Sequence, residues 1–279
     1  MRNLRIGPAG WSYPQWKGVV YPSAGPHPLE TLSRQFDAVE INSSFYQPLK
    51  PEVVKLWMKK VQANAGFQFT AKLHRQFTHQ RILEESGIAQ FKDGLWPLLR
   101  AGKLGGLLMQ FPWAFRFTAE NREYFIRLRR AFHEFPLLAE MRHSSWMAEE
   151  AVGTFLDYRV GFCNIDQPES MRAMPPTAFL TSHIGYARLH GRGPGYLYSD
   201  EELAEWARRI ERIGRYAESM FVIFNNDAGA KSVVNALQLQ AMLLGVRAPA
   251  PRELRRRYPV ELETFGPHRA EQQYLFPAA

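Results

Sequence analysis

The sequence is short of cysteine and of long apolar runs, and each shortage excludes a class of protein. Cys163 is the single cysteine among 279 residues, so no intramolecular disulfide and no cysteine-cluster metal site can form. No run of about 18 apolar residues occurs, and the first residues lack the apolar segment of an export signal. We therefore expect a cytoplasmic protein with no membrane partner.

Acidic residues are also outnumbered, with 27 Asp and Glu against 35 Lys and Arg, for a formal net charge of +8. This excess favours an anionic partner, and either a small anionic substrate or a nucleic acid would fit. A hydrophobic content of 46% is enough for one large buried core. The sequence does not define the oligomeric state.

Short β-type runs alternate with helical patterns along most of the chain. The expected strands are 4–7, 36–41, 67–72, 105–111, 137–142, 160–165, 185–190 and 220–225. Helical spacing follows most of them, with Ser144 or Ser145 expected to cap a helix through Phe155, and a Ser199 to Glu202 capping box expected before residues 200–216. A proline-containing loop with little helical signal follows the sixth strand. Eight strands with crossovers predict a (β/α)8 TIM barrel, and an open doubly wound sheet is the alternative.

We predict two parts of the chain: a barrel domain over residues 1–245 and a C-terminal extension over residues 246–279. The extension contains Pro249, Pro251, Pro259 and the run Arg255 to Arg257. It is expected to pack on the barrel or to be partly mobile.

The polar residues of the expected strands share one phase. Glu140 and Arg142, two positions apart, point to the same face of an extended strand, while Ala139 and Met141 point to the other. The same counting in other strands places polar side chains inside the barrel near its C-terminal rim, where such barrels carry their active sites. The candidate catalytic residues are Glu40, Lys72, Glu140, Asp166 and His190, and the candidate substrate-binding residues from strands are Asn42, Gln110, Arg142, Asn164, Arg188 and Asn226.

Loops that follow the strands contribute further candidates. Aromatic side chains over a polar floor suit sugars, nucleosides or flipped bases. Arg192 lies in the glycine-rich segment 191–195, which lacks the spacing of known phosphate-binding loops, and His143 either caps a helix or serves the site. The candidate binding residues from loops are Trp11, Tyr46, His143, Trp146, Arg192 and Tyr196.

Three chemistries fit this ring of residues. Glu40, Glu140, Asp166 and His190 are plausible ligands of a divalent metal ion, but Lys72, Arg142 and Arg188 lie in the same layer and offset their charge. Metal-independent acid–base catalysis therefore fits better, and no cofactor is predicted. Schiff-base formation by Lys72 is weakened because neighbouring carboxylates are expected to raise its pKa. A buried ion network that only stabilises the barrel is the structural alternative.

Several ordered motifs resemble those of the bacterial and archaeal DUF72 (YecE-like) family. They are residues 10–13 (GWSY), 40–46 (EINSSFY), Lys72 with 78–79 (TH), 110–112 (QFP), 140–146 (EMRHSSW), 188–192 (RLHGR) and 224–227 (FNND). The resemblance covers residues 4–244 and implies a TIM-type barrel, without implying a reaction. Met141 replaces the usual phenylalanine and Trp113 a common second proline, which leaves the polar ring unchanged.

The sequence thus favours an enzyme that acts on a small polar or anionic, sugar-like or phosphate-like substrate by metal-independent acid–base chemistry. A nucleic-acid-binding protein, or a metal-dependent phosphodiesterase analogous in fold to endonuclease IV, is the alternative that the basic charge supports. A non-catalytic ligand-binding barrel is the third hypothesis.

Overall fold

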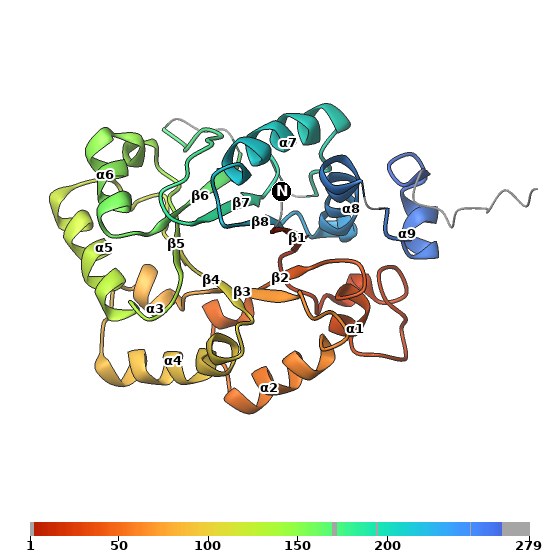
Figure 1. Ribbon diagram of the computed structural model, residues 1–279, viewed down its shortest axis with the longest axis horizontal. Coiled ribbons are helices and arrows are strands. Elements are labelled where there is room, and N and C mark those ends of the chain that lie inside the picture. The colour runs from red at the N-terminus through yellow and green to blue at the C-terminus, as the bar shows by residue number, and fades with distance from the viewer. Residues whose placement is uncertain (1–2, 169–171, 194, 246, 264–279) are drawn as a thin grey trace, which may run out of the picture.

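Eight parallel strands form the centre of the molecule. The computed structural model describes residues 3–168, 172–193, 195–245 and 247–263, and the helices lie around the strands (Figure 1). The strands are hydrogen-bonded in the order β1-β8-β7-β6-β5-β4-β3-β2. Their bounds lie within two residues of those expected: β1 (Leu4–Pro8), β2 (Ala38–Ile41), β3 (Gln68–Lys72), β4 (Leu104–Gln110), β5 (Leu137–Glu140), β6 (Gly161–Asp166), β7 (Ile184–Leu189) and β8 (Ser219–Phe224).

The two end strands, β1 and β2, meet and close the ring. Ala9 forms a parallel bridge with Glu40, and the Gly10 amide donates to the Glu40 carbonyl at 2.8 Å. Gly7 makes this approach feasible, because a Cβ at that position would lie 1.8 Å from the Ala38 carbonyl oxygen. The fold is therefore a (β/α)8 barrel, as predicted, and the alternative of an open sheet is wrong.

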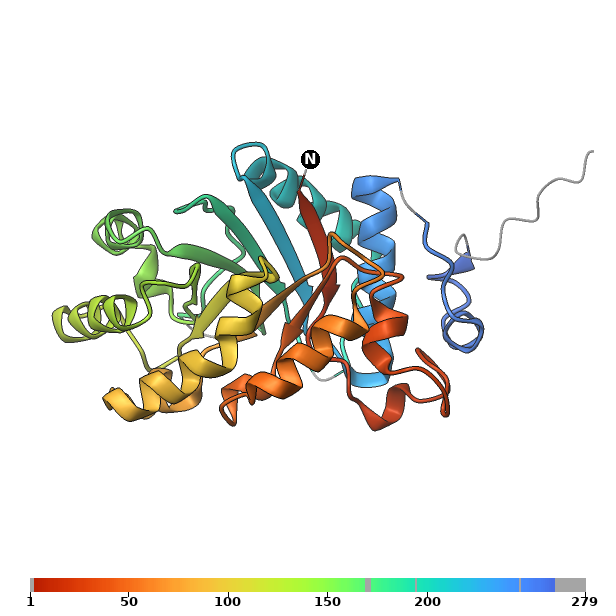
Figure 2. The same ribbon diagram turned by 60° about the horizontal axis from the view of Figure 1, so that its bottom comes forward.

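Helices cover the outside of the barrel (Figure 2). They are α1 (Pro28–Leu32), α2 (Pro51–Lys60), α3 (Arg75–Thr78), α4 (Glu85–Arg100), α5 (Ala119–Ala131), α6 (Glu149–Asp157), α7 (Asp200–Gly214) and α8 (Lys231–Leu244). Between β6 and β7, the described residues 167–168 and 172–183 form no helix, in line with the weak helical signal there. An extended segment therefore covers β6, which determines the direction of its side chains.

The capping predictions have different outcomes. Before α7, the Ser199 hydroxyl accepts from the Glu202 amide while the Glu202 carboxylate accepts from the Ser199 amide, so the capping box is confirmed. The serine cap expected after β5 is wrong. His143 caps the short 3-10 helix η3 (Ser144–Met147), and α6 begins separately after Ala148.

Large side chains fill the lower half of the barrel interior. The rings of Tyr186 and Phe221 lie 6.2 Å apart, and the Arg5 guanidinium lies over Phe221 at the N-terminal end. Leu138 packs into space left by Gly106, where a Cβ would come within 2.4 Å of its Cδ1. The amino end of the barrel is therefore filled, and the polar residues lie towards the carboxyl end.

The described part of the C-terminal extension packs on the barrel beside α8 (Figure 1). The helix α9 (Arg252–Arg257) buries Leu254, and Tyr258 donates a hydrogen bond to the Gly229 carbonyl at 2.7 Å. The rest of the predicted extension, from residue 264 on, lies outside the described residues. Within the described ranges, no helix is both long and apolar enough to cross a membrane.

Candidate active site at the carboxyl end of the barrel

Three charged side chains form a buried cluster inside the barrel. Arg188 of β7 binds Glu40 of β2, with Nη2 2.8 Å from Oε1, and Glu140 of β5, with Nη1 3.0 Å from Oε2. All three side chains are at most 1% exposed. The strand phases predicted this convergence of residues that lie far apart in sequence.

The cluster fixes the protonation of its members. Burial alone would raise the pKa of Glu140, but Arg188, His190 and Arg142 together hold it well below its ordinary value. Burial would likewise lower the pKa of Arg188, but Glu40 and Glu140 raise it well above the ordinary value. Glu140 and Arg188 therefore stay charged at neutral pH, and Glu140 is better suited to holding cations than to carrying protons.

A hydrogen-bond chain below the cluster orients Glu40. The Tyr186 hydroxyl donates to Glu40 Oε2 at 2.9 Å and is 3.0 Å from the Thr70 hydroxyl. Arg188 contacts both oxygens of the same carboxylate. Glu40 is thus surrounded by fixed donors, which locks its position.

The upper side of Glu140 faces residues at the rim. Its Oε1 accepts from Gln110 Nε2 at 2.9 Å and from Arg142 Nε at 3.1 Å, and lies 3.4 Å from His190 Nε2. The side chain of Arg142 is 36% exposed and contacts Glu140 through Nε. Its terminal nitrogens are therefore the accessible cationic groups above Glu140.

Asn225 is a member of the site that the sequence analysis missed. Its Oδ1 accepts from Arg188 Nη2 at 3.0 Å, and its Nδ2 is 3.1 Å from His190 Nδ1. Nδ1 thus accepts from Asn225, while Nε2 lies between Arg188 Nη1 at 3.1 Å and Glu140 Oε1 at 3.4 Å. Burial, opposed by Glu140, lowers the pKa of His190, so the ring is neutral at pH 7.

Lys72 lies next to the cluster, and its amine has a lowered pKa. Its Nζ lies 4.2 Å from the centre of the Phe45 ring and makes no hydrogen bond or ion pair with any described residue. Burial, followed by the charge of Arg188, lowers its pKa to about 8. Glu40 and Glu140 raise this pKa, as expected, but burial and Arg188 outweigh them, so the net shift is downward.

A second titratable pair lies where β1 and β8 end. Asp227 accepts a hydrogen bond from the Tyr13 hydroxyl at 2.9 Å, while its other oxygen has no partner among the described residues. Burial raises the pKa of Asp227 to about 6. Sequence reasoning used Asp227 only as part of a motif, since one acidic residue in a loop carries no signal of burial.

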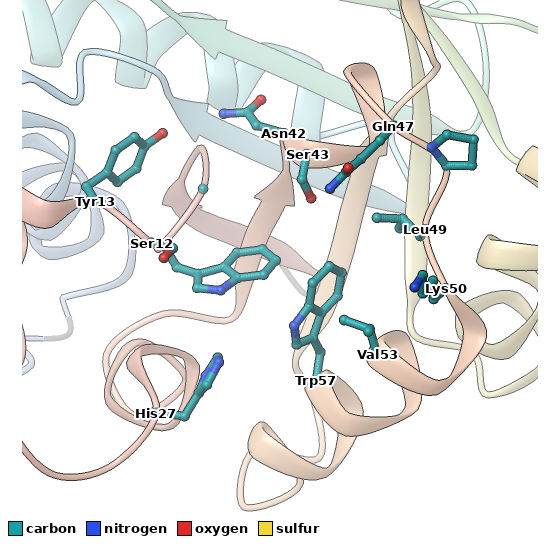
Figure 3. A pocket seen from close by; sticks show the side chains of 13 residues that line it. Ser12, Tyr13, His27, Asn42, Ser43, Gln47, Leu49, Lys50, Val53 and Trp57 are labelled. Atoms are coloured by element: carbon teal, nitrogen blue, oxygen red, sulfur yellow. The ribbon is translucent and has the colours of Figure 1, made fainter.

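A groove of about 730 Å³ opens beside the cluster, between the loops after β1 and β2 and the helix α2 (Figure 3). Trp11 and Asn42, both predicted to bind substrate, line it. Trp57 and Val53 from α2 and Leu49 form an apolar wall. The groove has the size of a small-molecule site, and its position at the carboxyl ends of the strands is where such barrels bind substrates.

The predicted direction of the β6 side chains is wrong. Asn164 points out of the barrel, donating to the Phe179 carbonyl at 3.0 Å and accepting from the Thr177 hydroxyl at 2.8 Å. Asp166 also points outward, next to Tyr198, and burial raises its pKa. Cys163 and Ile165 face inward in their place, in register with Tyr186 and Arg188.

The residues predicted after β7 and β8 form a separate group. Asn226 donates to the Tyr196 carbonyl at 3.0 Å and to Asn235 at 2.9 Å, so Asn225 takes the interior position that was predicted for Asn226. The Tyr196 hydroxyl donates to Glu202, and the Arg192 guanidinium pairs with the same carboxylate at 3.3 Å. These contacts join the loop after β7 to α7 and leave Arg192 and Tyr196 outside the ion cluster.

Three loop residues take positions that sequence could not determine. Trp146 is fully buried, donates to the Phe115 carbonyl at 2.7 Å and stacks on its ring, so its prediction as a surface for substrate is wrong. Tyr46 is 65% exposed and projects outside the groove lining. His143 accepts from the Ser145 amide through Nδ1, which makes capping its observed contact, while its Nε2 has no partner among the described residues.

The donor set does not suit a divalent metal ion. Among the described residues, no three His, Cys, Asp or Glu side chains gather as a metal-binding group. Asp166 points away, and Arg188 occupies oxygens of both glutamates, so a cation would have to displace a guanidinium. The carboxylate oxygens of the cluster are therefore already neutralised by a cation of the protein itself.

These features define a class: (β/α)8 barrels that carry an arginine-centred ion cluster at the carboxyl end. The family model described as "Protein of unknown function DUF72" matches residues 5–256, so the chain belongs to the DUF72 family. The match extends into α9, beyond the limit of residue 244 that the sequence motifs indicated.

Named relatives agree with this assignment. The UPF0759 protein YunF of Bacillus subtilis is 26% identical over 90% of this chain and 99% of its own length. The UPF0759 protein YecE of Escherichia coli K12 is 32% identical over 40% of this chain and 39% of its own length. A crystal structure of a DUF72 family protein from Thermotoga maritima has a TM-score of 0.78 and 28% identity, covering 87% of this chain and 99% of that one.

Proposed function

We propose that this protein is an enzyme that acts on a small polar, anionic substrate by metal-independent proton transfer at the carboxyl end of the barrel. The observation that carries the proposal is the Nζ of Lys72, which is buried beside Phe45 and has no partner among the described residues. Its pKa of about 8 gives a substantial neutral fraction near physiological pH, as a general base requires.

The other residues have supporting roles in this proposal. Glu40, Glu140 and Arg188 form a fixed scaffold, because their charges satisfy one another. Arg142 lies above Glu140 and offers donors to an incoming phosphate or carboxylate, next to the proposed base Lys72. Both ring nitrogens of the neutral His190 contact protein groups, Asn225 on one side and Glu140 and Arg188 on the other, so it helps to hold the cluster in place.

Solvent-deuterium exchange tests the proposal without knowledge of the natural substrate. Sugar phosphates and 2-oxo acids would be incubated with the protein in D2O, and loss of the C–H signals beside the carbonyl would be followed by NMR. We expect exchange into at least one compound, unchanged by EDTA and abolished by Lys72→Met. Lys55→Met, on the exposed face of α2, is the matched control and should keep full activity.

Two results would count against this function. Exchange that survives Lys72→Met would remove the lysine from the mechanism, and exchange abolished by EDTA would replace it with metal chemistry. Tight binding of a compound that shows no exchange or conversion would favour the non-catalytic barrel.

A covalent variant uses the same lysine. A neutral amine attacks a carbonyl carbon, water leaves, and the resulting imine can be trapped by borohydride. The lowered pKa of Lys72 fits both this variant and the general-base role. A borohydride-dependent mass increase on Lys72 with a 2-oxo acid would favour the covalent variant.

Nucleic-acid binding is the second candidate function, and one surface feature favours it. An outer groove of about 370 Å³ is lined by residues 176–178 and by four residues of α7, Glu205, Arg208, Arg209 and Arg212, of which Glu205 pairs with Arg209. A duplex bound there would lose affinity steeply as salt rises, and replacing Arg208 and Arg212 with alanine would reduce that salt dependence. DNA or RNA affinity that is insensitive to salt would eliminate this candidate.

A further inference from the structure

The groove beside the ion cluster has walls suited to a flat ring. Trp11 and Trp57 meet at 83° with ring centres 4.9 Å apart, so one ring can offer a face and the other an edge to a ligand. Leu49, Val53 and Pro48 continue the apolar surface. No Asp or Glu is among the described lining residues, and Lys50 is the single Lys or Arg among them.

Polar groups occur at the edges of the groove. Asn42 and Ser43 line one edge of the groove, and the buried Asn42 Oδ1 has no hydrogen-bond partner among the described residues. His27 accepts from the Leu29 amide through Nδ1, so the proton of its neutral ring is on Nε2. The groove therefore combines large apolar surfaces with a few polar contacts, the composition of small-molecule sites.

One short turn contacts both the groove and Lys72. The 3-10 helix η2 (Ser43–Phe45) lines the groove with Ser43 and covers the Lys72 Nζ with Phe45. Ser44, between them, binds the Lys72 amide at 3.1 Å and the Lys72 carbonyl at 2.7 Å. The groove and the Lys72 ammonium group therefore flank the same three-residue helix.

We propose that this groove binds a flat heteroaromatic ring of a substrate whose anionic group lies at Arg142, as in a nucleoside monophosphate. The anionic half of this inference rests on the proposed function, whereas the ring half rests on the groove alone. A sugar ring fits less well, because apolar walls formed by Trp57, Val53 and Leu49 would leave several hydroxyl groups without hydrogen-bond partners.

Equilibrium binding of three probes to the full chain tests both halves. Adenosine 5′-monophosphate carries ring and phosphate, ribose 5-phosphate carries the phosphate, and adenosine carries the ring. Stacking of one base contributes enough to change affinity by about tenfold or more, so we expect adenosine 5′-monophosphate to bind at least about tenfold more tightly than ribose 5-phosphate. Trp57→Ala should remove this preference and leave the affinity for ribose 5-phosphate within about twofold.

Two further variants keep the result interpretable. Trp96→Ala makes the same change on α4, where Trp96 packs on Phe135 away from the groove, and should keep the preference. Val53→Trp adds bulk at a position of α2 that is 38% exposed, so it fills the groove without opening the core and should also remove the preference.

Equal affinity for the two phosphates, or a preference that survives both Trp57→Ala and Val53→Trp, would overturn the inference. Failure of both adenosine and its monophosphate to bind would overturn it too. Adenosine binding that depends on Trp57 supports the ring site even if ribose 5-phosphate fails to bind, and that failure would count against the proposed anionic function instead.

Discussion

Removal of the Arg188 guanidinium should destabilise the fold strongly, because two buried carboxylates depend on it. In Arg188→Met, Glu40 and Glu140 would keep their buried positions, each 0% exposed, but lose the cation 2.8 and 3.0 Å away. Breaking a buried ion pair by removing one partner costs about 3 to 5 kcal/mol. The change in unfolding free energy, measured by urea denaturation at pH 7, should therefore fall in or above that range.

The pH dependence distinguishes lost charge pairing from lost packing. In the wild type the folded-state pKa of Glu140 is lowered, so its contribution to stability is present above the unfolded value of about 4.3 and is lost as pH falls. In the variant, burial without Arg188 should raise the folded-state pKa of Glu140, so stability should fall as pH rises. The difference between the two proteins should therefore shrink from pH 7 to pH 4.

Matched variants complete the test. Arg209→Met breaks a partly exposed pair, 2.6 Å from Glu205, and should cost about 1 kcal/mol or less. Adding Glu40→Gln and Glu140→Gln to Arg188→Met should recover much of the lost stability. A cost for Arg188→Met similar to that for Arg209→Met, or a cost that is the same at pH 4 and pH 7, would refute the reasoning.

Three further predictions concern single residues. Acetylation of Lys72, followed by mass spectrometry, should rise with a midpoint near pH 8, whereas an ordinary exposed lysine titrates near about 10.4, and a midpoint above 10 would contradict the lowered pKa. Burial raises the folded-state pKa of Asp227 to about 6, above the unfolded value of about 3.9, so its contribution to stability is lost as pH rises through 6. Relative to the wild type, the unfolding free energy of Asp227→Asn should therefore increase by about 1 to 2 kcal/mol between pH 4 and pH 8 in denaturation experiments. Trp146→Ala should cost about 3 to 5 kcal/mol of unfolding free energy because it empties a fully buried site, whereas Tyr46→Ala, at 65% exposure, should cost less than about 0.5 kcal/mol.

The barrel and the core of the site could be predicted from the sequence because polar and apolar residues alternate along several strands. Glu40 alternates with Val39 and Ile41, and Arg188 with Ala187 and Leu189, so each strand has one polar face and one apolar face. Those outer faces pack on helices, which need apolar contact. Alternation was therefore a reliable guide wherever a helix covers the strand.

Strands β6 and β8 show where the same reasoning fails. An extended segment covers β6, and its backbone amides and carbonyls need hydrogen-bond partners, which Asn164 provides from the outer face. In β8, residues 220–224 are all apolar, so alternation could not decide between Asn225 and Asn226. Burial of Trp146 was equally hidden, since its partners Phe115 and Phe155 come from other parts of the chain.

The pKa of Lys72 depends on where the neighbouring charges lie, which their number in the sequence does not reveal. Counted along the sequence, Glu40, Glu140 and Asp166 balance the cations of the ring, which argues for an ordinary lysine. In the structure Asp166 points outward, both glutamates bind Arg188, and the Lys72 Nζ is left against Phe45 without an acceptor among the described residues. The cationic groups left towards the rim thus belong to Lys72 and Arg142, and this is why we propose an anionic substrate for the site.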